Sequence, residues 1–247
     1  MKAQLLTLLL IILGLSVPCV GQMRTKLYIQ SPVRITDSKL YYKVSPKKKG
    51  KEVEFASIEV GRASMGDAYL YQGPKVLELY REANEESKPL ARVKLFEGEC
   101  MVVLFPVVYE GKKRMISQAI NVGGSSPSFG ERLLFNLTGE DVGVEVSPTL
   151  PLQRGAKGNV RVKCAAGGSV LVPRPTNTPG DWAPMPLVIG VKKGKRWEEF
   201  SQGRWFDTPD LRHFVFLYKD GRRNRAHVFT VSQQKPMERQ EMVGGNP

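Results

Sequence analysis

The sequence predicts an all-β protein built from two β-sandwich domains in tandem, related by an internal duplication. Three observations support this prediction. Short runs rich in valine, leucine, tyrosine and phenylalanine recur along the chain. Clusters of glycine, proline, asparagine and aspartate separate these runs at spacings of about 8–12 residues, and one half of the chain resembles the other. Because no stretch keeps a helical period over three turns, the pattern favours a sandwich or a barrel.

Residues 1–21 have the pattern of a secretory signal peptide. A positive charge at Lys2 precedes an apolar run over residues 5–15, and small residues follow, so we expect cleavage after Gly21. The apolar run is shorter than the ~20 residues that a membrane span requires. A buried N-terminal strand or helix is the alternative interpretation.

Cys19 raises a further alternative, a lipoprotein anchored through its thiol. Lipoprotein signals carry a leucine three residues before the cysteine and a small residue directly before it. Ser16 and Pro18 occupy those places here, so the sequence favours a cleaved signal without a lipid. We therefore expect an exported protein, periplasmic or extracellular, with no transmembrane segment after cleavage.

The strand signals follow one another along the whole chain. The clearest segments are residues 26–30, 39–44, 53–60, 75–81, 100–108, 132–137 and 214–218. Residues 76–80 and 142–146 alternate between apolar and mixed positions. Such alternation is typical of a sheet with one face on a core and the other in water.

The two halves of the chain share a pattern of strand and turn. An apolar strand, an acidic-Gly-basic turn and a returning strand occur at residues 101–117 and again at residues 213–229. Upstream, residues 73–80 correspond to residues 184–191 with a nearly constant offset. A repeat as long as a small domain predicts duplication of a whole domain. Chance likeness between hairpins of similar composition is the alternative.

The duplication makes specific predictions about single positions. Residues 39–42 resemble residues 132–135, with a different loop length before the next match. Leu104 and Phe216 are expected at equivalent core positions. Trp205 has an apolar counterpart in the first half, which predicts a core position for its ring.

Five segments are expected along the chain: a signal peptide over residues 1–21, a first sandwich over 22–122, a linker over 123–130, a second sandwich over 131–232 and a disordered tail over 233–247. The linker is placed where small, polar residues gather. The tail is polar and ends in Gly-Gly-Asn-Pro.

This layout resembles that of exported bacterial proteins of unknown function with paired immunoglobulin-like β-sandwich domains. Residues 129–139 and 211–218 carry the resemblance. It implies the fold but no activity and no functional residues. The Cys…Trp…Cys hallmark of true immunoglobulin domains is absent, so the likeness is architectural.

The chain is basic, with 37 Lys and Arg against 24 Asp and Glu and a formal charge of +13. Removing the signal peptide removes only Lys2, so the mature protein keeps nearly all of this charge. For an exported protein the available polyanions are envelope glycans, other anionic polymers and lipid headgroups, and we expect no nucleic-acid partner. A basic solvated surface without a partner is the alternative.

Candidate binding residues lie in two basic turns and one aromatic position. The turns occupy matching places in the two halves, so side-by-side domains would merge their charges into one surface. Trp182 follows a Pro-Gly-Asp turn. The full set is Lys112, Lys113, Arg114, Arg222, Arg223, Arg225 and Trp182.

The sequence predicts no catalytic residue, no metal site and no cofactor. His213 and His227 are expected on neighbouring strands, but no third ligand with recognisable spacing accompanies them. The carboxylate pairs Glu198–Glu199 and Asp207–Asp210 lie near tryptophans, yet adjacent strand residues point to opposite faces. No nucleophile elbow and no phosphate-binding loop occur.

Cys100 and Cys164 lie in different halves, so two free, buried thiols are expected. The function that fits best is a non-enzymatic binding or structural module of the cell envelope, contacting a protein partner or an anionic polymer. The alternatives are a hydrolase with an unrecognised site, acting on envelope or extracellular glycans, and a subunit joined to a surface assembly through strand edges.

Overall fold

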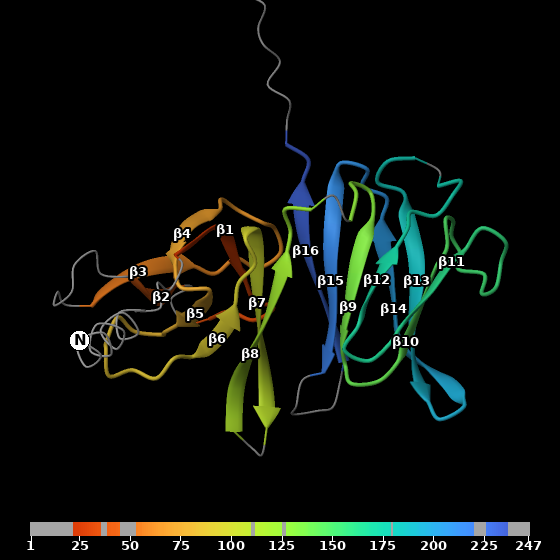
Figure 1. The fold of residues 1–247 in the computed structure, drawn as a ribbon. Coiled ribbons are helices and arrows are strands. Elements are labelled where there is room, and N and C mark those ends of the chain that lie inside the picture. The colour runs from red at the N-terminus through yellow and green to blue at the C-terminus, as the bar shows by residue number, and fades with distance from the viewer. Residues whose placement is uncertain are drawn as a thin grey trace, which may run out of the picture.

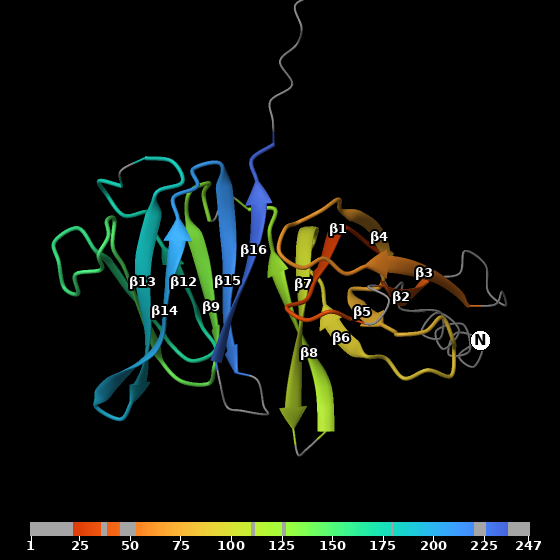
Figure 2. The ribbon, with the colours of Figure 1, turned by 180° about the vertical axis from the view of Figure 1, so that it is seen from behind.

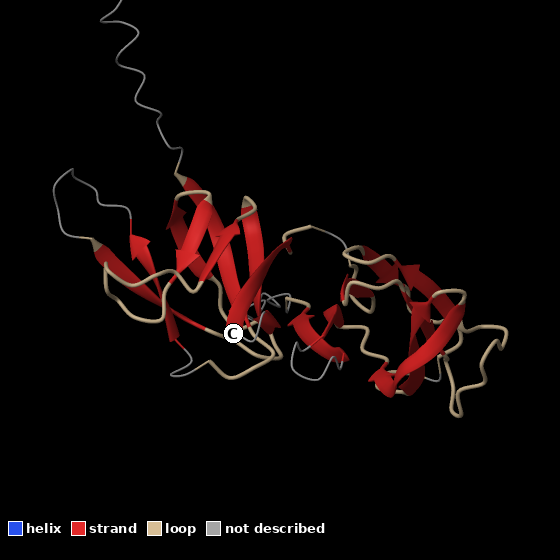
Figure 3. Ribbon diagram, turned by 90° about the horizontal axis from the view of Figure 1, so that it is seen from below, coloured by secondary structure: helices blue, strands red, loops and turns tan. Residues whose placement is uncertain are grey.

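The computed structural model describes residues 22–35, 39–44, 53–109, 112–124, 127–178, 180–219 and 226–236. These residues form strands and loops, which confirms the all-β prediction (Figure 3). The strands are β1 (Met23–Gln30), β2 (Lys39–Val44), β3 (Glu54–Glu59), β4 (Tyr69–Gly73), β5 (Val76–Leu79), β6 (Ala91–Lys94), β7 (Gly98–Tyr109), β8 (Lys112–Asn121), β9 (Arg132–Leu137), β10 (Val142–Val146), β11 (Val160–Cys164), β12 (Ser169–Val172), β13 (Pro184–Lys193), β14 (Arg196–Phe206), β15 (Leu211–Lys219) and β16 (Ala226–Gln234).

The first half of the chain, β1 to β8, contains a four-stranded sheet of order β4-β1-β7-β8, called here the first inner sheet. Two shorter ladders, β2-β3 and β5-β6, face it. A bridge between Tyr41 and Tyr80 joins these ladders, since each residue's N–H donates to the other's carbonyl at 2.9 and 2.8 Å.

The second half, β9 to β16, contains two four-stranded sheets. The order β12-β9-β15-β16 forms the second inner sheet, and the order β11-β10-β13-β14 forms the outer sheet. The two inner sheets have the same strand order when eight is added to each strand number. In both, the first strand of the half runs parallel to the seventh, β1 to β7 and β9 to β15.

Three apolar clusters hold these layers together. One lies between the first inner sheet and the short ladders, and a second lies between the second inner sheet and the outer sheet. The third lies between the two inner sheets and joins the halves through residues such as Met101, Phe105, Phe214 and Phe216. Figures 1 and 2 both show β8 and β16 side by side at this junction.

The inner strands β7 and β15 are therefore covered on both faces. Residues 100–105 and 212–218 are buried without a break. A strand buried on both faces favours apolar residues at successive positions, which explains why residues 100–105 and 214–218 are continuous apolar runs and do not alternate. The buried Arg212 and His213 are hydrogen-bonded.

The expected equivalence of Leu104 and Phe216 is wrong. Leu104 packs in the core of the first half, whereas Phe216 packs between the halves. Because successive strand residues point to opposite faces, Phe105 and not Leu104 shares the environment of Phe216. The likeness of residues 39–42 to 132–135 also fails as an equivalence, since it matches β2, which lies outside the first inner sheet, with β9, which lies in the second.

Several expectations concern residues that the structure does not describe. The signal peptide over 1–21, residues 125–126 of the linker, the turn residues 220–225 and residues 237–247 of the tail lie outside the described ranges. Strand β16 extends to Gln234, two residues into the segment assigned to the tail. Within the described ranges, no helix has the length and apolar character needed to cross a membrane.

Candidate functional site

Among the described strands, no other layer covers one face of the outer sheet. In β10, Val142, Val144 and Val146 point into the core of the second half. Alternation then turns Gly143 and Glu145 to the opposite, outer face. Gly143 pairs with Gly190 of β13, so two glycines lie side by side in the middle of this face.

A groove of about 540 Å³ lies over these glycines. We call it the Trp197 groove. Strands β10, β11, β13 and β14 all contribute to it, together with Arg154 from the loop that precedes β11. Its lining residues include Gly143, Glu145, Arg161, Gly190, Trp197 and Glu199.

Trp197 lies on the glycine floor. A Cβ added at Gly143 would lie 3.2 Å from the six-membered ring of Trp197, and one added at Gly190 would lie 3.7 Å from it. Any larger side chain at position 143 would therefore displace the ring. Trp197 as a residue is 44% exposed, so part of its surface is open to a ligand.

A register shift in the β13–β14 ladder lies beside the floor. Ile189 pairs with Ser201, but Gly190 pairs with Glu199, so Phe200 is an extra residue on β14. Such a bulge re-aims the side chains that follow it. Phe200 packs against the core, while Glu199 lines the groove.

Glu145 anchors one wall of the groove. Its Oε1 accepts hydrogen bonds from the Gly155 N–H and Asn159 Nδ2, both at 2.7 Å, and from Arg161 Nε at 3.0 Å. Burial raises the pKa of Glu145, but these three donors outweigh burial and hold the pKa below its ordinary value. Glu145 is therefore an ionised structural acceptor that fixes the loop over residues 147–159 against the sheet.

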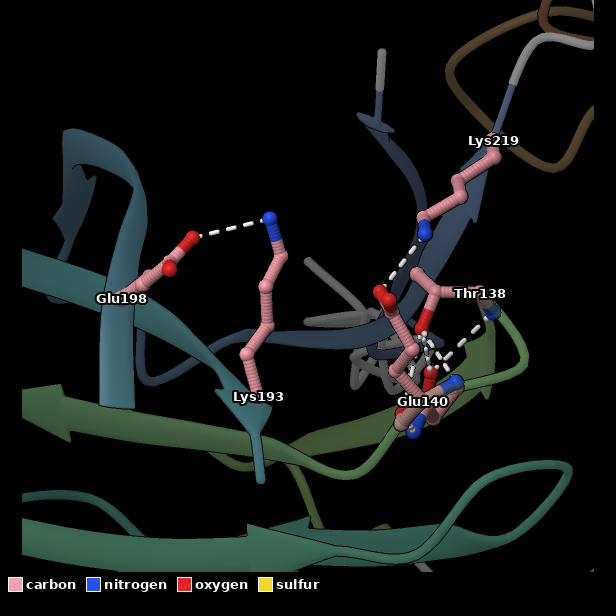
Figure 4. Close-up of polar contacts among 6 residues, drawn as sticks. Thr138, Glu140, Lys193, Glu198 and Lys219 are labelled. Carbon is pink, nitrogen blue, oxygen red and sulfur yellow. Dashed lines mark hydrogen bonds and ion pairs between the residues drawn. The ribbon is translucent and has the colours of Figure 1, made fainter. Parts of the chain in front are cut away.

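The other two carboxylates of the lining are also paired. Glu199 forms an ion pair with Arg154. Glu198 lies 2.8 Å from Lys193 Nζ, near the tip of the β13–β14 hairpin. Figure 4 shows this ion pair together with a second one, in which Lys219 Nζ of β15 lies 2.6 Å from Glu140 Oε2.

The groove thus combines an aromatic surface with compensated charges. Each carboxylate in the lining has a cationic partner. Glycoside hydrolysis needs one carboxyl group that keeps its proton until it protonates the leaving group. The hydrogen bonds and the ion pair of Glu145 favour its charged form, and the groove can bind a ligand by stacking and hydrogen bonding.

The predicted binding residues lie elsewhere. Arg114 is exposed on β8. Lys112 and Lys113 lie on the same strand, but the structure does not describe their side chains. Arg222, Arg223 and Arg225 lie outside the described residues. Strands β7 and β15, which precede the two basic turns, run toward the same end of the molecule (Figures 1 and 2).

Trp182 is 66% exposed and has a φ of 62°, a conformation that costs energy for a residue with a side chain. The backbone N–H of Trp182 donates a hydrogen bond to the backbone carbonyl of Asp207. Trp182 does not line the Trp197 groove. Trp205, in contrast, packs against the core and lies under the guanidinium of Arg132 at 5.0 Å, as predicted for a core ring.

The two histidines do not form a site together. His213 pairs with Ser232 and His227 pairs with Tyr218, five residues further along the ladder, a separation of roughly 17 Å. His213 is buried, with its ring nitrogens 2.7 Å from Thr208 Oγ1 and 2.9 Å from Ser232 Oγ. The described residues contain no group of His, Cys, Asp or Glu suited to a metal ion.

An ion pair with one buried partner lies next to Thr208, which contacts His213. Asp207 is fully buried and pairs with Arg174. Its second oxygen, Oδ1, has no hydrogen-bond partner among the described residues. Asp210, the other acid of the pair considered in the sequence, is exposed, and its backbone carbonyl accepts a hydrogen bond from the Lys235 N–H.

The two cysteines lie in separate cores, as expected. Cys100 packs in the first half and Cys164 in the second, and both are free and buried. Burial raises the pKa of each thiol, which keeps both in the unreactive protonated form.

Comparison with known proteins adds no family to this description. No protein-family model matches the chain, and no curated protein matches its sequence. The candidate site therefore stands on its geometry alone.

Proposed function

We propose that this chain is an exported, non-catalytic binding module of the cell envelope, and that its ligand lies in the Trp197 groove. We further propose that its two halves are immunoglobulin-like sandwiches related by duplication. The shared strand order of the two inner sheets supports the second proposal.

One observation carries the binding proposal. The Trp197 ring rests on Gly143 and Gly190 and remains partly exposed. An exposed aromatic ring in a groove with charged side chains around it is typical of a contact that dominates a binding energy. Placing a tryptophan there exposes apolar surface that folding alone would bury.

Two features argue for binding without catalysis. Glycoside hydrolysis requires an acid that keeps its proton, whereas Glu145 is held in its charged form and Glu199 is paired with Arg154. The buried His213 contacts hydroxyls on both sides and lies outside the groove. A hydrolase remains the rival hypothesis.

A second contact surface is proposed at the basic turns after β7 and β15. The parallel course of these two strands toward one end of the molecule supports it, because each strand leads into one of the two turns (Figure 1). Such a surface would take an anionic polymer, and its binding would weaken steeply as salt rises.

The test is retention of the purified mature protein on sedimented bacterial envelope material, at a salt concentration high enough to screen the basic turns. We expect the wild type to sediment with the envelope without releasing soluble products. Trp197→Ala should lose most of this retention, and Phe96→Ala, which removes an equally exposed aromatic ring from the first half, should keep it. Equal retention of wild type and Trp197→Ala would refute the groove as the ligand site.

A further inference from the structure

We propose that the ligand of the Trp197 groove is an uncharged glycan chain, with one sugar ring stacked on the indole of Trp197. This inference rests on the proposed binding function and names the class of ligand. It differs from the anionic polymer that the composition of the whole chain suggests.

The charges of the groove lining balance one another. Although the chain carries a formal charge of +13, the groove lining is balanced. Three acidic and three basic residues line it, namely Glu145, Glu198, Glu199, Arg154, Arg161 and Lys163. A polyanion would meet three carboxylates there, and a polycation would meet three cations, whereas an uncharged ligand leaves the existing ion pairs intact.

The paired side chains of the groove keep donor and acceptor sites for a ligand. A hydroxyl both donates and accepts, and guanidinium and carboxylate groups have more donor and acceptor sites than one ion pair uses. Arg154, Arg161 and Glu199 can therefore bond to sugar hydroxyls while they stay paired. A polyhydroxylated ligand matches this mixture of fixed donors and acceptors.

The ring of Trp197 offers a fixed surface for stacking. The glycine floor holds the ring of Trp197 against the sheet, with a closest approach of 3.2 Å at position 143. A ring fixed in this way loses little freedom when it binds, and its exposed surface can cover the apolar face of a sugar ring.

The position of the groove in the outer sheet favours a glycan over a peptide. Peptides that bind to sheets add a strand to an exposed edge, where free backbone groups are available. The floor of the groove belongs to β10 and β13, which are interior strands paired on both sides. The floor therefore offers side chains and a ring but no backbone edge.

The experiment is an array of immobilised oligosaccharides that carries uncharged glucans, xylans, mannans and galactans beside uronate and sulfated glycans. The labelled mature protein is applied across a salt series, together with Trp197→Ala and the matched control Phe96→Ala. We expect retention on uncharged glycans that salt does not change. Trp197→Ala should bind about tenfold more weakly or worse, and Phe96→Ala should bind like wild type.

The other outcomes separate the two proposals. Retention on acidic glycans alone that Trp197→Ala loses would overturn the uncharged ligand but keep the groove as a binding site. Retention on acidic glycans alone that Trp197→Ala keeps and that rising salt abolishes would overturn the groove as a glycan site and assign the binding to the basic turns. Absence of retention on every glycan would overturn this inference, while the envelope sedimentation described above would still decide the proposed function.

Discussion

The rings of Phe105 and Phe216 meet with their centroids 5.5 Å apart, although 111 positions separate them in the chain. Phe105 belongs to the first inner sheet and Phe216 to the second. Phe216 also stacks on Phe135 at 5.0 Å. The two halves thus share an apolar core, and they are joined by packing as well as by the chain between them.

Phe216→Ala should lower the free energy of unfolding of the whole protein by about 3–5 kcal/mol, the usual cost of truncating a buried phenylalanine. Urea unfolding followed by fluorescence measures this change. Phe96→Ala should change it by less than about 0.5 kcal/mol, because this ring is exposed. A loss below about 1 kcal/mol for Phe216→Ala would show that the shared core does not hold the halves together.

His213 should make the protein less stable in mild acid. Burial, and after it the charge of Arg132, lower the pKa of His213 from 6.5 to about 4. The unfolded chain therefore takes up a proton as the pH falls below about 6.5, while the folded protein does not until about pH 4. Stability should fall by up to ~3 kcal/mol between these pH values.

Denaturant unfolding at pH 7, 5.5 and 4.5 tests this slope. The variant His213→Gln removes the titrating group and should flatten the part of the slope that His213 contributes, whatever it does to stability at pH 7. If the variant and the wild type lose stability in parallel, the slope comes from other groups.

Asn136 should be among the most sensitive polar positions. Its Nδ2 lies 2.7 to 3.1 Å from the carbonyls of Glu140, Cys164 and Ala165, and its Oδ1 accepts from Thr138. The side chain thus ties the β9–β10 turn to the β11–β12 turn. Asn136→Ala leaves these buried groups without partners and should cost roughly 3 kcal/mol or more.

Asn136→Asp provides the matched comparison, since it keeps the shape and the acceptor but removes the donors. It should also be destabilised, because a carboxylate would face three carbonyls. Thermal unfolding gives both values. Wild-type stability in Asn136→Asp would mean that the donors contribute little.

Gly143→Ala should weaken ligand binding while leaving the fold in place. The new Cβ would lie 3.2 Å from the Trp197 ring and must push it a few tenths of an ångström off the floor. Gly203→Ala is the matched control, because its Cβ would meet no atom within 4 Å on β14. Retention on envelope material should fall for the first variant and stay unchanged for the second, and equal retention would count against the role of the floor.

The continuous apolar segments of the sequence predict a feature of the fold that its alternating segments do not. Residues 100–105 and 214–218 are apolar at consecutive positions, and strands of this kind are buried on both faces. That signal predicts a third core between the halves. The alignment of Leu104 with Phe216 was wrong because such strands lack the alternation that fixes which face a residue takes.

The groove was only partly predictable. Gly143 and Gly190 lie inside strands, where glycine is unfavourable unless another group comes close to the backbone. This signal could have found the floor. The position of Trp197 on it depends on the register of β13 against β14 and on the bulge at Phe200, which are set by packing and not by local sequence.

The most direct test of the Trp197 groove is an NMR titration of the ¹⁵N-labelled mature protein with the oligosaccharide retained most strongly on the array. We predict that the indole N–H of Trp197 and the backbone amides of Gly143 and Gly190 shift first and saturate together, with the same dissociation constant. Shifts confined to strand ends beside the basic turns, such as Arg114 and Lys219, with the groove signals unmoved, would contradict the account.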